Sequence, residues 1–250
     1  RFEELQKVLE LGYTIAGSKE AYMERPFINH HYCPIVTPLT MDVESTEAVT
    51  YLAQQGLPVY TTAPVSNAGM TSPMSRMGTL VLGNAEFLAI NCYYQMIREG
   101  MPIIYAYLPT IADLRTGAYT PGAMETGILS MAHTEMAEFY HVPSGGYIGL
   151  TNSHCNDAQN GYEVAMNTTG AVCAGASLLN MGGLLDSLTT FDFSSATKRK
   201  PWRMTSFLLL QHRPTWRCCN LFGDSAAPGA PAAECGRNRQ GAGSSIPATG

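Results

Sequence analysis

The sequence is short of charge and of long apolar runs. Only 14% of its 250 residues are charged, whereas 45% are hydrophobic, which is enough for a sizeable core and excludes wholesale disorder. No run approaches the roughly 18 apolar residues that a membrane-spanning helix needs. The formal net charge of −5 provides no overall basic surface for nucleic acid. These absences predict a globular protein that binds neither membranes nor nucleic acid.

The sequence signatures of several common function classes are also missing. There is no GxGxxG, no GxxxxGK[ST] and no HExxH, so dinucleotide-binding, P-loop and zincin functions lose their usual support. The chain opens on a charged, helix-like stretch at 1–12 rather than on a secretory signal. Cys33, Cys92, Cys155 and Cys173 are scattered without CxxC pairs, which favours reduced, mostly buried thiols. We therefore expect a cytoplasmic protein.

Charge is distributed unevenly along the chain. Residues 1–194 hold seven Lys or Arg and eighteen Asp or Glu, a balance of −11, whereas residues 195–250 hold eight and two, a balance of +6. We predict a folded domain over 1–194 and a basic, Gly/Pro/Ala-rich tail over 195–250. The tail is disordered or translated in a shifted reading frame, and a basic arm for nucleic acid or an acidic partner is the alternative. Because the chain begins with Arg1 rather than Met, we expect its true N-terminus to be missing, and a shifted reading frame in the tail would leave it incomplete at the other end too.

Short apolar segments headed by proline recur through the first region. They begin at Pro34, Pro58, Pro102 and Pro143. Proline is tolerated best at the first position of a strand, and it disfavours helix for the residue before it. Each of these prolines therefore predicts the start of a strand, and a fifth strand is expected at 177–180.

Helical segments alternate with these strands. One helix is predicted at 43–55. A second is expected to begin with Asn84 as its N-cap and to stop at Gly100. Thr120, followed by a proline at the first helical position, predicts the start of a third helix, and Asp157 predicts the cap of a fourth.

Alternating helices and apolar strands predict an α/β fold, with a parallel sheet covered by helices. A doubly wound sheet and a (β/α)8 barrel both satisfy this pattern. About five βα units fit into the first region where a barrel needs eight, so a partial barrel and an open sheet remain alternatives. In both folds the functional site lies beyond the carboxyl ends of the strands. The loops at 62–78, 108–120 and 151–157 are therefore expected to gather at one end of the sheet.

These loops carry amides, hydroxyls and one imidazole, with Asn67, Asn152 and His154 among them. Tyr105 and Tyr107 lie two residues apart and so share one face of a strand. Tyrosines at a strand end are commonly core residues, but they are also what a site for an alkylammonium cation would use.

Nucleophilic and metal sites have less support. Cys155 is adjacent to His154, and neighbours in an extended segment point to opposite sides, so the two do not form a catalytic pair. His30, His31 and Cys33 could ligate a metal, but no second cluster at a set spacing accompanies them. We therefore predict no metal site in this chain.

Three blocks of sequence carry a resemblance to a known family. Residues 64–89 (PVSNAGMTSPMSRMGTLVLGNAEFLA), 97–146 and 149–163 resemble, in the same order, the trimethylamine–corrinoid protein methyltransferases, the MttB-like family. The resemblance extends over residues 2–194 and ends where the composition changes. It implies a TIM (β/α)8 barrel, here partial, followed by an irregular tail.

The resemblance also implies an enzyme of the kind found in methanogenesis. Such an enzyme moves a methyl group from a methylated amine to the Co(I) corrinoid (cobalamin) that a partner protein carries. The best-known members contain pyrrolysine, whereas this sequence has only standard residues. Many relatives without pyrrolysine act on quaternary amines, so a substrate like glycine betaine is favoured and trimethylamine is second. The expected partners are a corrinoid protein and a small methylated amine, no cofactor is permanently bound, and an oligomer is possible.

The chemistry agrees with this order of substrates. A quaternary nitrogen leaves as a neutral tertiary amine when Co(I) attacks its methyl group, so no general acid is needed. The protein has only to hold the cation and to align methyl and cobalt, which is catalysis by positioning.

The residues predicted to bind this substrate lie at or beyond the strand ends. They are Tyr105, Tyr107, Tyr147, Asn67, Asn152, His154, Arg115 and Glu125. The three tyrosines would surround the cation. Arg115 or His154 could hold a carboxylate, and Glu125, Asp113 or Asp157 could face the ammonium. No catalytic residue is assigned.

Two alternative functions stay open. One is an inactive, truncated fragment of the same enzyme, because a barrel that lacks strands exposes sheet edges. The other is a TIM-barrel lyase or hydrolase that uses a metal, which metal analysis of the purified protein would identify.

Overall fold

The structure is a computed structural model, and it describes most of the first 198 residues. The described residues are 2–28, 30–57, 59, 61–62, 64–147, 149–180 and 183–198. The predicted tail therefore lies outside the described residues from position 199 onward. Only its first four residues are described, as part of a helix, α7 (Phe193–Lys198).

Five short parallel strands form the central sheet. They are β1 (His31–Tyr32), β4 (Thr61–Thr62), β6 (Ile104–Ala106), β9 (Ser144–Tyr147) and β10 (Leu178–Asn180). Their spatial order, β1-β4-β6-β9-β10, is also their order along the chain, and every neighbouring pair is parallel. A doubly wound sheet reverses its strand order at a switch point, and no reversal occurs among these five strands.

Two of the central strands continue into a second sheet. β5 (Val65–Ala68) follows β4, and β7 (Leu108–Asp113) follows β6 after a break at Tyr107. β5 and β7 are parallel, and β8 (Ala118–Thr120) turns back against β7. The prediction that 108–120 is a loop is therefore wrong, because most of the segment is a β-hairpin.

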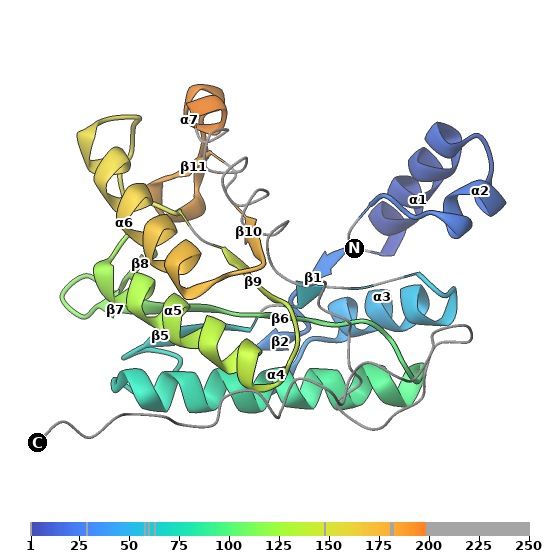
Figure 1. Cartoon of the computed structure of the whole chain (residues 1–250), viewed down its shortest axis with the longest axis horizontal. Helices are drawn as coiled ribbons and strands as arrows, with labels where there is room; N and C mark the ends of the chain where they lie inside the picture. Colours follow the sequence, from blue (N-terminus) through green and yellow to red (C-terminus); the bar gives the residue numbers. More distant parts are fainter. Residues whose placement is uncertain are drawn as a thin grey trace, which may run out of the picture. The chain divides into compact units, whose positions relative to one another are not determined.

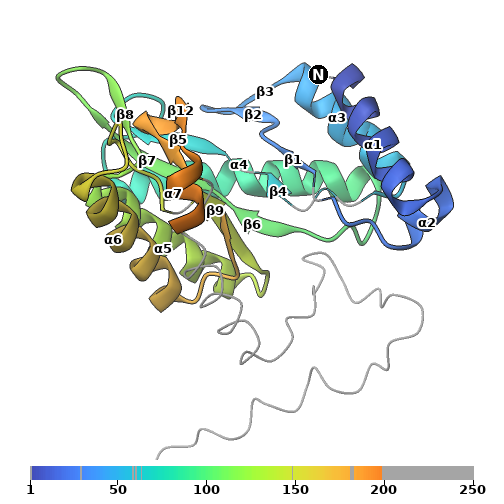
Figure 2. The same cartoon turned by 90° about the horizontal axis from the view of Figure 1, so that it is seen from above.

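Four helices connect the strands of the central sheet. They are α3 (Val43–Gln54), α4 (Arg76–Ile97), α5 (Met124–Phe139) and α6 (Ala158–Ala174), and α5 and α6 lie side by side in both views (Figures 1 and 2). The predicted cap of the fourth helix is confirmed, since the Asp157 carboxylate accepts from the Asn160 amide at 2.9 Å. α6 ends at Gly175, whose φ of 88° is the left-handed conformation that glycine adopts most easily. α1 (Phe2–Ala16) and α2 (Lys19–Glu24) precede the sheet.

Two predicted helix starts are wrong. Asn84 is not a cap but lies inside α4, which begins eight residues earlier because the Ser75 hydroxyl accepts from the Gly78 amide. Thr120 closes β8 rather than capping a helix, and α5 begins after Ala123. In both cases side chains with capping ability also satisfy other hydrogen bonds, and the residues alone do not distinguish the two uses.

The proline rule for strands holds in part. Pro143 directly precedes β9, and Pro102 lies two residues before β6. A strand also begins directly after Pro34, but it does not belong to the parallel sheet, because the parallel strand β1 ends before this proline. The residues after it form an antiparallel hairpin of β2 (Ile35–Val36) and β3 (Thr40–Met41). Pro58 lies outside the described residues.

A second small hairpin follows β10. It consists of β11 (Leu184–Leu185), a 3-10 turn, η1 (Asp186–Leu188), and β12 (Thr190–Phe191), and it leads into α7. Its antiparallel register pairs Leu184 with Phe191. This hairpin has no counterpart in the sequence prediction.

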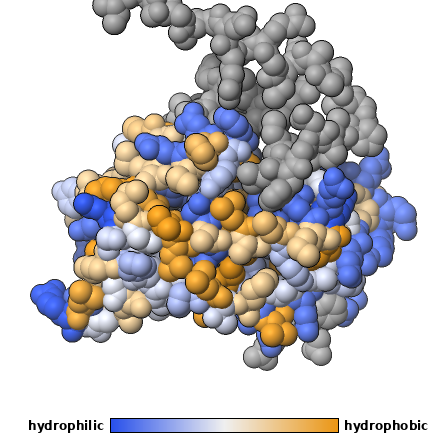
Figure 3. Space-filling model, turned by 90° about the horizontal axis from the view of Figure 1, so that it is seen from below, coloured by the Kyte–Doolittle hydropathy of each residue, from blue (hydrophilic) through white to orange (hydrophobic). Residues whose placement is uncertain are grey.

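The main core cluster lies among α1, α2, α3, α4 and the adjoining strands. Its fully buried members include Tyr22, Leu52, Leu57, Ile90 and Tyr94. Other apolar side chains remain at the surface and gather in a band on the face shown in Figure 3. Among the described residues, no helix combines the length and apolar character needed to cross a bilayer.

The expectation of mostly buried thiols is wrong. Cys92, Cys155 and Cys173 are exposed, and Cys33 is half-buried. None of these four cysteines takes part in a disulfide.

Candidate functional site

Three segments meet at the carboxyl ends of the parallel strands. They are the turn at 119–122 before α5, the loop at 149–157 before α6, and residues 183–192 after β10. Hydrogen bonds connect each segment with the others. The predicted approach of the loops around 120 and 151–157 is thus observed as direct contact.

Asn152 is the residue that links the three segments. Its Oδ1 accepts from the backbone amide of Gly122 at 3.0 Å and lies 3.5 Å from the hydroxyl of Ser187. The Ser187 hydroxyl also donates to the carbonyl of Tyr119 at 2.9 Å. One carboxamide therefore sets the spacing between segments that are about 30 and 35 residues distant in the chain.

The carboxylate of Glu163, on α6, holds the loop after β9. Its Oε2 accepts from the Thr151 hydroxyl at 2.6 Å and from the Asn152 amide at 2.7 Å. Its Oε1 accepts from Gln159 Nε2 at 2.8 Å, one helical turn away. Hydrogen bonds to a carboxylate are among the strong ones, so the loop is fixed where it leaves the strand.

The start of α6 fixes the other end of the same loop. The Asp157 carboxylate accepts from the Ser153 hydroxyl at 2.8 Å in addition to capping the helix. The amide of Asn160 and then the Ser153 hydroxyl hold the pKa of Asp157 below its ordinary value. The carboxylate therefore stays ionised at neutral pH.

Residues 186–188 have an unusual backbone. Asp186, Ser187 and Leu188 are three consecutive non-glycine residues with positive φ, at 48°, 52° and 81°. Each such residue costs on the order of 1–3 kcal/mol, and such strain concentrates at functional sites. The amides of Asp186 and Ser187 donate to the carbonyls of Ser153 and Thr151, at 2.8 and 3.1 Å, which helps to hold the strained turn against the loop.

His154 lies at the solvent-facing side of this cluster. Its Nδ1 is 2.8 Å from Asp186 Oδ1, and the two side chains are 83% and 37% exposed. A pair this exposed to water contributes little to stability. It does place an imidazole and a carboxylate at the solvent-exposed side of the cluster.

Tyr105 and Tyr107 share one strand face as predicted, but that face is covered by helices. The Tyr105 hydroxyl donates to Asn84 of α4 at 2.8 Å, and its ring stacks on His133 of α5. The Tyr107 hydroxyl donates to the carbonyl of Thr79 at 2.8 Å. The two residues are 1% and 2% exposed, so neither offers a ring face to a ligand in this structure.

Burial also decides the ionisation of both phenols. It raises the pKa of Tyr105, and the neighbouring phenols Tyr140 and Tyr107 add to the effect. It likewise raises the pKa of Tyr107, although the nearby Ser66 hydroxyl opposes the increase. Both are neutral core residues between the sheet and helices α4 and α5.

The remaining predicted site residues are dispersed. Asn67 is 9% exposed and accepts from Thr110 on the adjacent strand at 3.3 Å. Arg115 is 90% exposed in the β7–β8 turn, where it pairs with Asp113 of its own hairpin. Glu125 is half-buried in the first turn of α5. The side chain of Tyr147 lies outside what the structure describes, although its backbone pairs with Asn180.

The structure therefore brings together Asn152 and His154 and adds residues that sequence analysis missed. The additions are Thr151, Glu163, Asp186 and Ser187. The position of Glu163 carried a weak signal, since it follows Gln159 by one helical turn. The strained turn carried no sequence signal. A positive φ is usually predicted from a glycine, and residues 186–188 contain no glycine.

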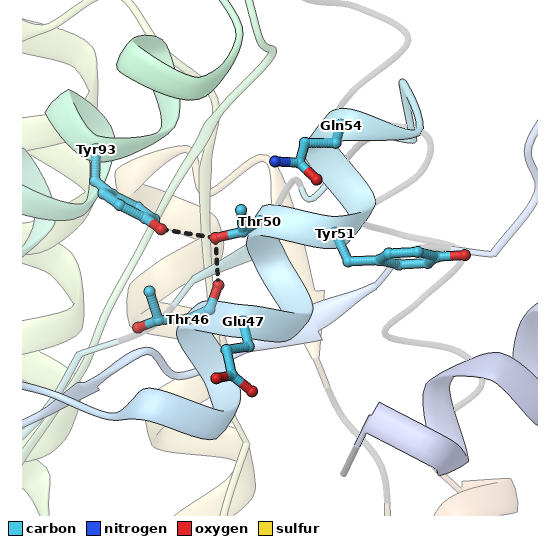
Figure 4. Close-up of a pocket in the computed structure, with 6 residues that line it drawn as sticks. All are labelled: Thr46, Glu47, Thr50, Tyr51, Gln54 and Tyr93. Atoms are coloured by element: carbon cyan, nitrogen blue, oxygen red, sulfur yellow. Dashed lines mark hydrogen bonds between the residues drawn. The ribbon is translucent and has the colours of Figure 1, made fainter.

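A separate shallow pocket of about 360 Å³ is formed by side chains of α3 and α4 (Figure 4). It is lined by Thr46, Glu47, Thr50, Tyr51, Gln54 and Tyr93. Thr50 Oγ1 and the Tyr93 hydroxyl lie 2.6 Å apart, so a hydrogen bond joins the two helices beneath it. This pocket is formed by helix surfaces rather than by strand-end loops.

The described residues contain no group of three or more His, Cys, Asp or Glu side chains placed to hold a metal.

Comparison with known proteins places the chain in a family. Residues 2–195 match the family described as trimethylamine methyltransferase (MTTB). The chain belongs to the trimethylamine methyltransferase family. The matched region contains the entire strand-end cluster and ends inside α7, close to the change in composition.

Curated relatives of this family share about a third of the aligned residues. The trimethylamine methyltransferase MttB of Desulfitobacterium hafniense is 30% identical over 76% of the chain. The glycine betaine methyltransferase of the same species is 34% identical over 73% of the chain, and MttB of Methanosarcina thermophila is 30% identical over 70%. The chain spans about two fifths of the length of these relatives, since it covers 38%, 38% and 36% of them.

Proposed function

We propose that this chain is the part of a corrinoid-dependent methyltransferase that holds the methylated amine. The observation that carries the proposal is the membership of residues 2–195 in the trimethylamine methyltransferase family. The hydrogen-bonded cluster at the carboxyl ends of the strands supports it, because that is where α/β enzymes of this kind place their chemistry. The names of the relatives supply the substrate class, trimethylamine and glycine betaine.

We further propose that the five parallel strands are part of a (β/α)8 barrel in the complete protein. Their order follows the chain without a reversal, as it does in a barrel. In that arrangement the loops around Asn152 and Ser187 belong to one end of the barrel, and the substrate lies above them.

A cationic substrate fits the electrostatics of this region. No Lys or Arg occurs between Arg115 and Lys198, whereas seven carboxylates do, among them Glu125, Glu163 and Asp186. A surface of one sign raises the local concentration of ions of the opposite sign. Quaternary and protonated tertiary amines both carry the positive charge that this surface attracts.

Among these amines, we favour a quaternary one such as glycine betaine. When its methyl group is transferred, the carbon–nitrogen bond breaks and the electron pair stays on nitrogen, which leaves as a neutral amine. The methyl group passes to the Co(I) centre of a separate corrinoid protein, whose cobalt supplies the electron pair of the new bond. No proton has to be delivered, so the chain contributes binding and alignment. Within the cluster, Asn152 and His154 are the groups we assign to the substrate's carboxylate, and Asp186 provides negative charge for its ammonium.

The proposal is tested by offering glycine betaine and trimethylamine to the purified chain together with a corrinoid protein reduced to Co(I). Methylation of the corrinoid is followed by its absorbance. A second arm replaces the matched segment of the D. hafniense glycine betaine methyltransferase by residues 2–195 of this chain. We expect corrinoid-dependent methyl transfer from glycine betaine in the chimera. Transfer from trimethylamine alone would contradict the substrate, and turnover without corrinoid would contradict the mechanism.

A further inference from the structure

We propose that Glu163 is a positioning residue that sets the conformation of the substrate-binding loop at 149–157. The inference rests on the proposed function, because it assigns Glu163 a task in the same site. Glu163 acts from α6, through Thr151 and Asn152, and not by contact with the reacting atoms.

The first support is the geometry of the carboxylate. A single oxygen, Oε2, accepts from both the Thr151 hydroxyl and the Asn152 amide, at 2.6 and 2.7 Å. These donors are adjacent in the chain at the point where it leaves β9. Fixing both therefore fixes the direction in which the Asn152 side chain points.

The second support is that the same oxygen lies against a glycine of another segment. A Cβ added to Gly122 would lie 2.2 Å from Glu163 Oε2 and 2.9 Å from the Asn152 amide nitrogen. Gly122 also donates its own amide to Asn152 Oδ1 at 3.0 Å. The absence of a side chain at this position is thus what allows Glu163, Asn152 and the turn before α5 to meet.

The third support is what the loop holds in place. The carbonyls of Thr151 and Ser153 accept from the strained residues Ser187 and Asp186, and Asp186 in turn pairs with His154. The loop therefore holds the turn after β10 in its conformation. A shift of the loop would move His154 and Asp186 as well as Asn152.

Two substitutions separate the positioning role from the charge. In Glu163→Gln the amide oxygen can still accept from Thr151 and Asn152, while its NH2 group faces Gln159, whose side-chain amide can rotate to accept. In Glu163→Ala both carboxylate oxygens are lost, so the Thr151 hydroxyl and the backbone amide of Asn152 lose their acceptor. We expect the rate of amide exchange in 149–157 of Glu163→Gln to stay within about twofold of the wild-type rate. We expect Glu163→Ala to speed amide exchange in 149–157 by at least about tenfold, because the loop loses two hydrogen bonds to a charged group.

Gly122→Ala provides an independent route to the same effect. Its methyl group would displace the Glu163 carboxylate without changing it, so we expect the same faster exchange in 149–157. Gly161→Ala is the matched control, because Gly161 lies exposed in α6 and an added Cβ meets nothing within 4 Å. The added methyl of Gly122→Ala meets the Asn152 backbone nitrogen as well as the Glu163 carboxylate, and only the second contact is shared with Glu163→Ala. The effect of the double variant should therefore be clearly less than the sum of the two single effects.

The experiment is hydrogen–deuterium exchange on the full 250-residue chain, combined with calorimetric titration of glycine betaine and tetramethylammonium. Glu163→Ala and Gly122→Ala should lower the affinity for glycine betaine about tenfold, whereas Glu163→Gln and Gly161→Ala should not. Unchanged exchange in 149–157 for Glu163→Ala would overturn the positioning role, as would additive effects in the double variant. Failure of the wild-type chain to bind any methylated amine would instead overturn the proposed function, while the exchange measurements would still decide the role of Glu163.

Discussion

At the scale of single residues, His133 shows how the core fixes a protonation state. The imidazole is 1% exposed, and its Nε2 lies 2.9 Å from the carbonyl of Tyr105, between the rings of Tyr105 and Tyr107. Burial lowers the pKa of His133 to about 4 and outweighs the hydrogen bonds to the carbonyls of Tyr105 and Ser130, which act in the opposite direction. The residue is therefore a neutral member of the core at physiological pH.

We expect acid to destabilise the fold through His133. In the folded protein the pKa of His133 is about 4, below the ordinary value of 6.5. The stability that neutral His133 contributes is therefore complete above pH 6.5 and is lost as the pH falls toward 4. The shift corresponds to about 3 kcal/mol of unfolding free energy. Urea unfolding between pH 7 and pH 4 should show a steeper loss for the wild type than for His133→Gln, which keeps a donor for the Tyr105 carbonyl. Equal slopes for the two proteins would contradict this role.

Gly83 is the residue that makes room for Tyr107. A Cβ at this position of α4 would lie 2.2 Å from the Tyr107 ring. We expect Gly83→Ala to lower the unfolding free energy by about 1–3 kcal/mol through overpacking, even though alanine favours helix. Gly161→Ala, in the exposed part of α6, should be neutral or stabilising by up to about 1 kcal/mol. Thermal unfolding of the two variants compares them directly, and a destabilised Gly161→Ala with a stable Gly83→Ala would reverse the argument.

At the scale of elements, helix α4 does more than cover the sheet. Its Glu86 carboxylate is fully buried and accepts from the Thr37 hydroxyl and the Leu39 amide, each at 2.9 Å. Leu39 has a φ of 54°, so the tip of the β2–β3 hairpin is held in a conformation that leucine rarely adopts. The hairpin after β1 is therefore fixed by a helix that begins more than thirty residues later.

Replacing Glu86 should loosen this hairpin selectively. Glu86→Leu leaves the Leu39 amide and the Thr37 hydroxyl without acceptors, so we expect a loss of about 1–3 kcal/mol for each buried unpaired group. Glu86→Gln retains an acceptor and should lose less. Amide exchange at residues 35–41 and urea unfolding measure the two effects. Glu138→Leu, at an exposed position of α5, is the control and should stay within about 0.5 kcal/mol of the wild type. An unaffected hairpin in Glu86→Leu would show that its other contacts suffice.

At the scale of the whole molecule, the distribution of charge is the main functional feature. The stretch between Arg115 and Lys198 contains seven carboxylates and no Lys or Arg, and it supplies all three segments of the strand-end cluster. Such a surface acts on any ligand through its sign, over distances limited by the Debye length.

We expect salt to weaken the binding of methylated amines. Choline and its uncharged isostere 3,3-dimethyl-1-butanol have the same shape and differ in charge, so the pair isolates the electrostatic contribution. Between 0.05 and 0.5 M NaCl the affinity for choline should fall by about three- to tenfold, while the isostere should bind weakly and show little dependence. Calorimetric titration provides both values. Equal salt dependence for the two ligands would show that the carboxylates do not guide binding.

The sequence by itself determined the alternation of strands and helices, several element positions and the family. The strand after Pro143, the helix capped by Asp157 and the strand at 177–180 were predictable, because each depends on residues close to it in the chain. The resemblance was equally readable, since 64–89, 97–146 and 149–163 lie in the region that the family matches.

Only the tertiary structure decided which faces and loops form the site. Tyr105 and Tyr107 were expected to face a ligand, and contacts with α4 and α5 assign them to the core instead. The cluster of Asn152, Glu163 and Ser187 depends on hydrogen bonds between residues up to 68 positions apart. Local patterns do not encode such pairings. They form because the carboxyl ends of parallel strands meet at one edge of the sheet, where polar groups that leave the strands must satisfy one another.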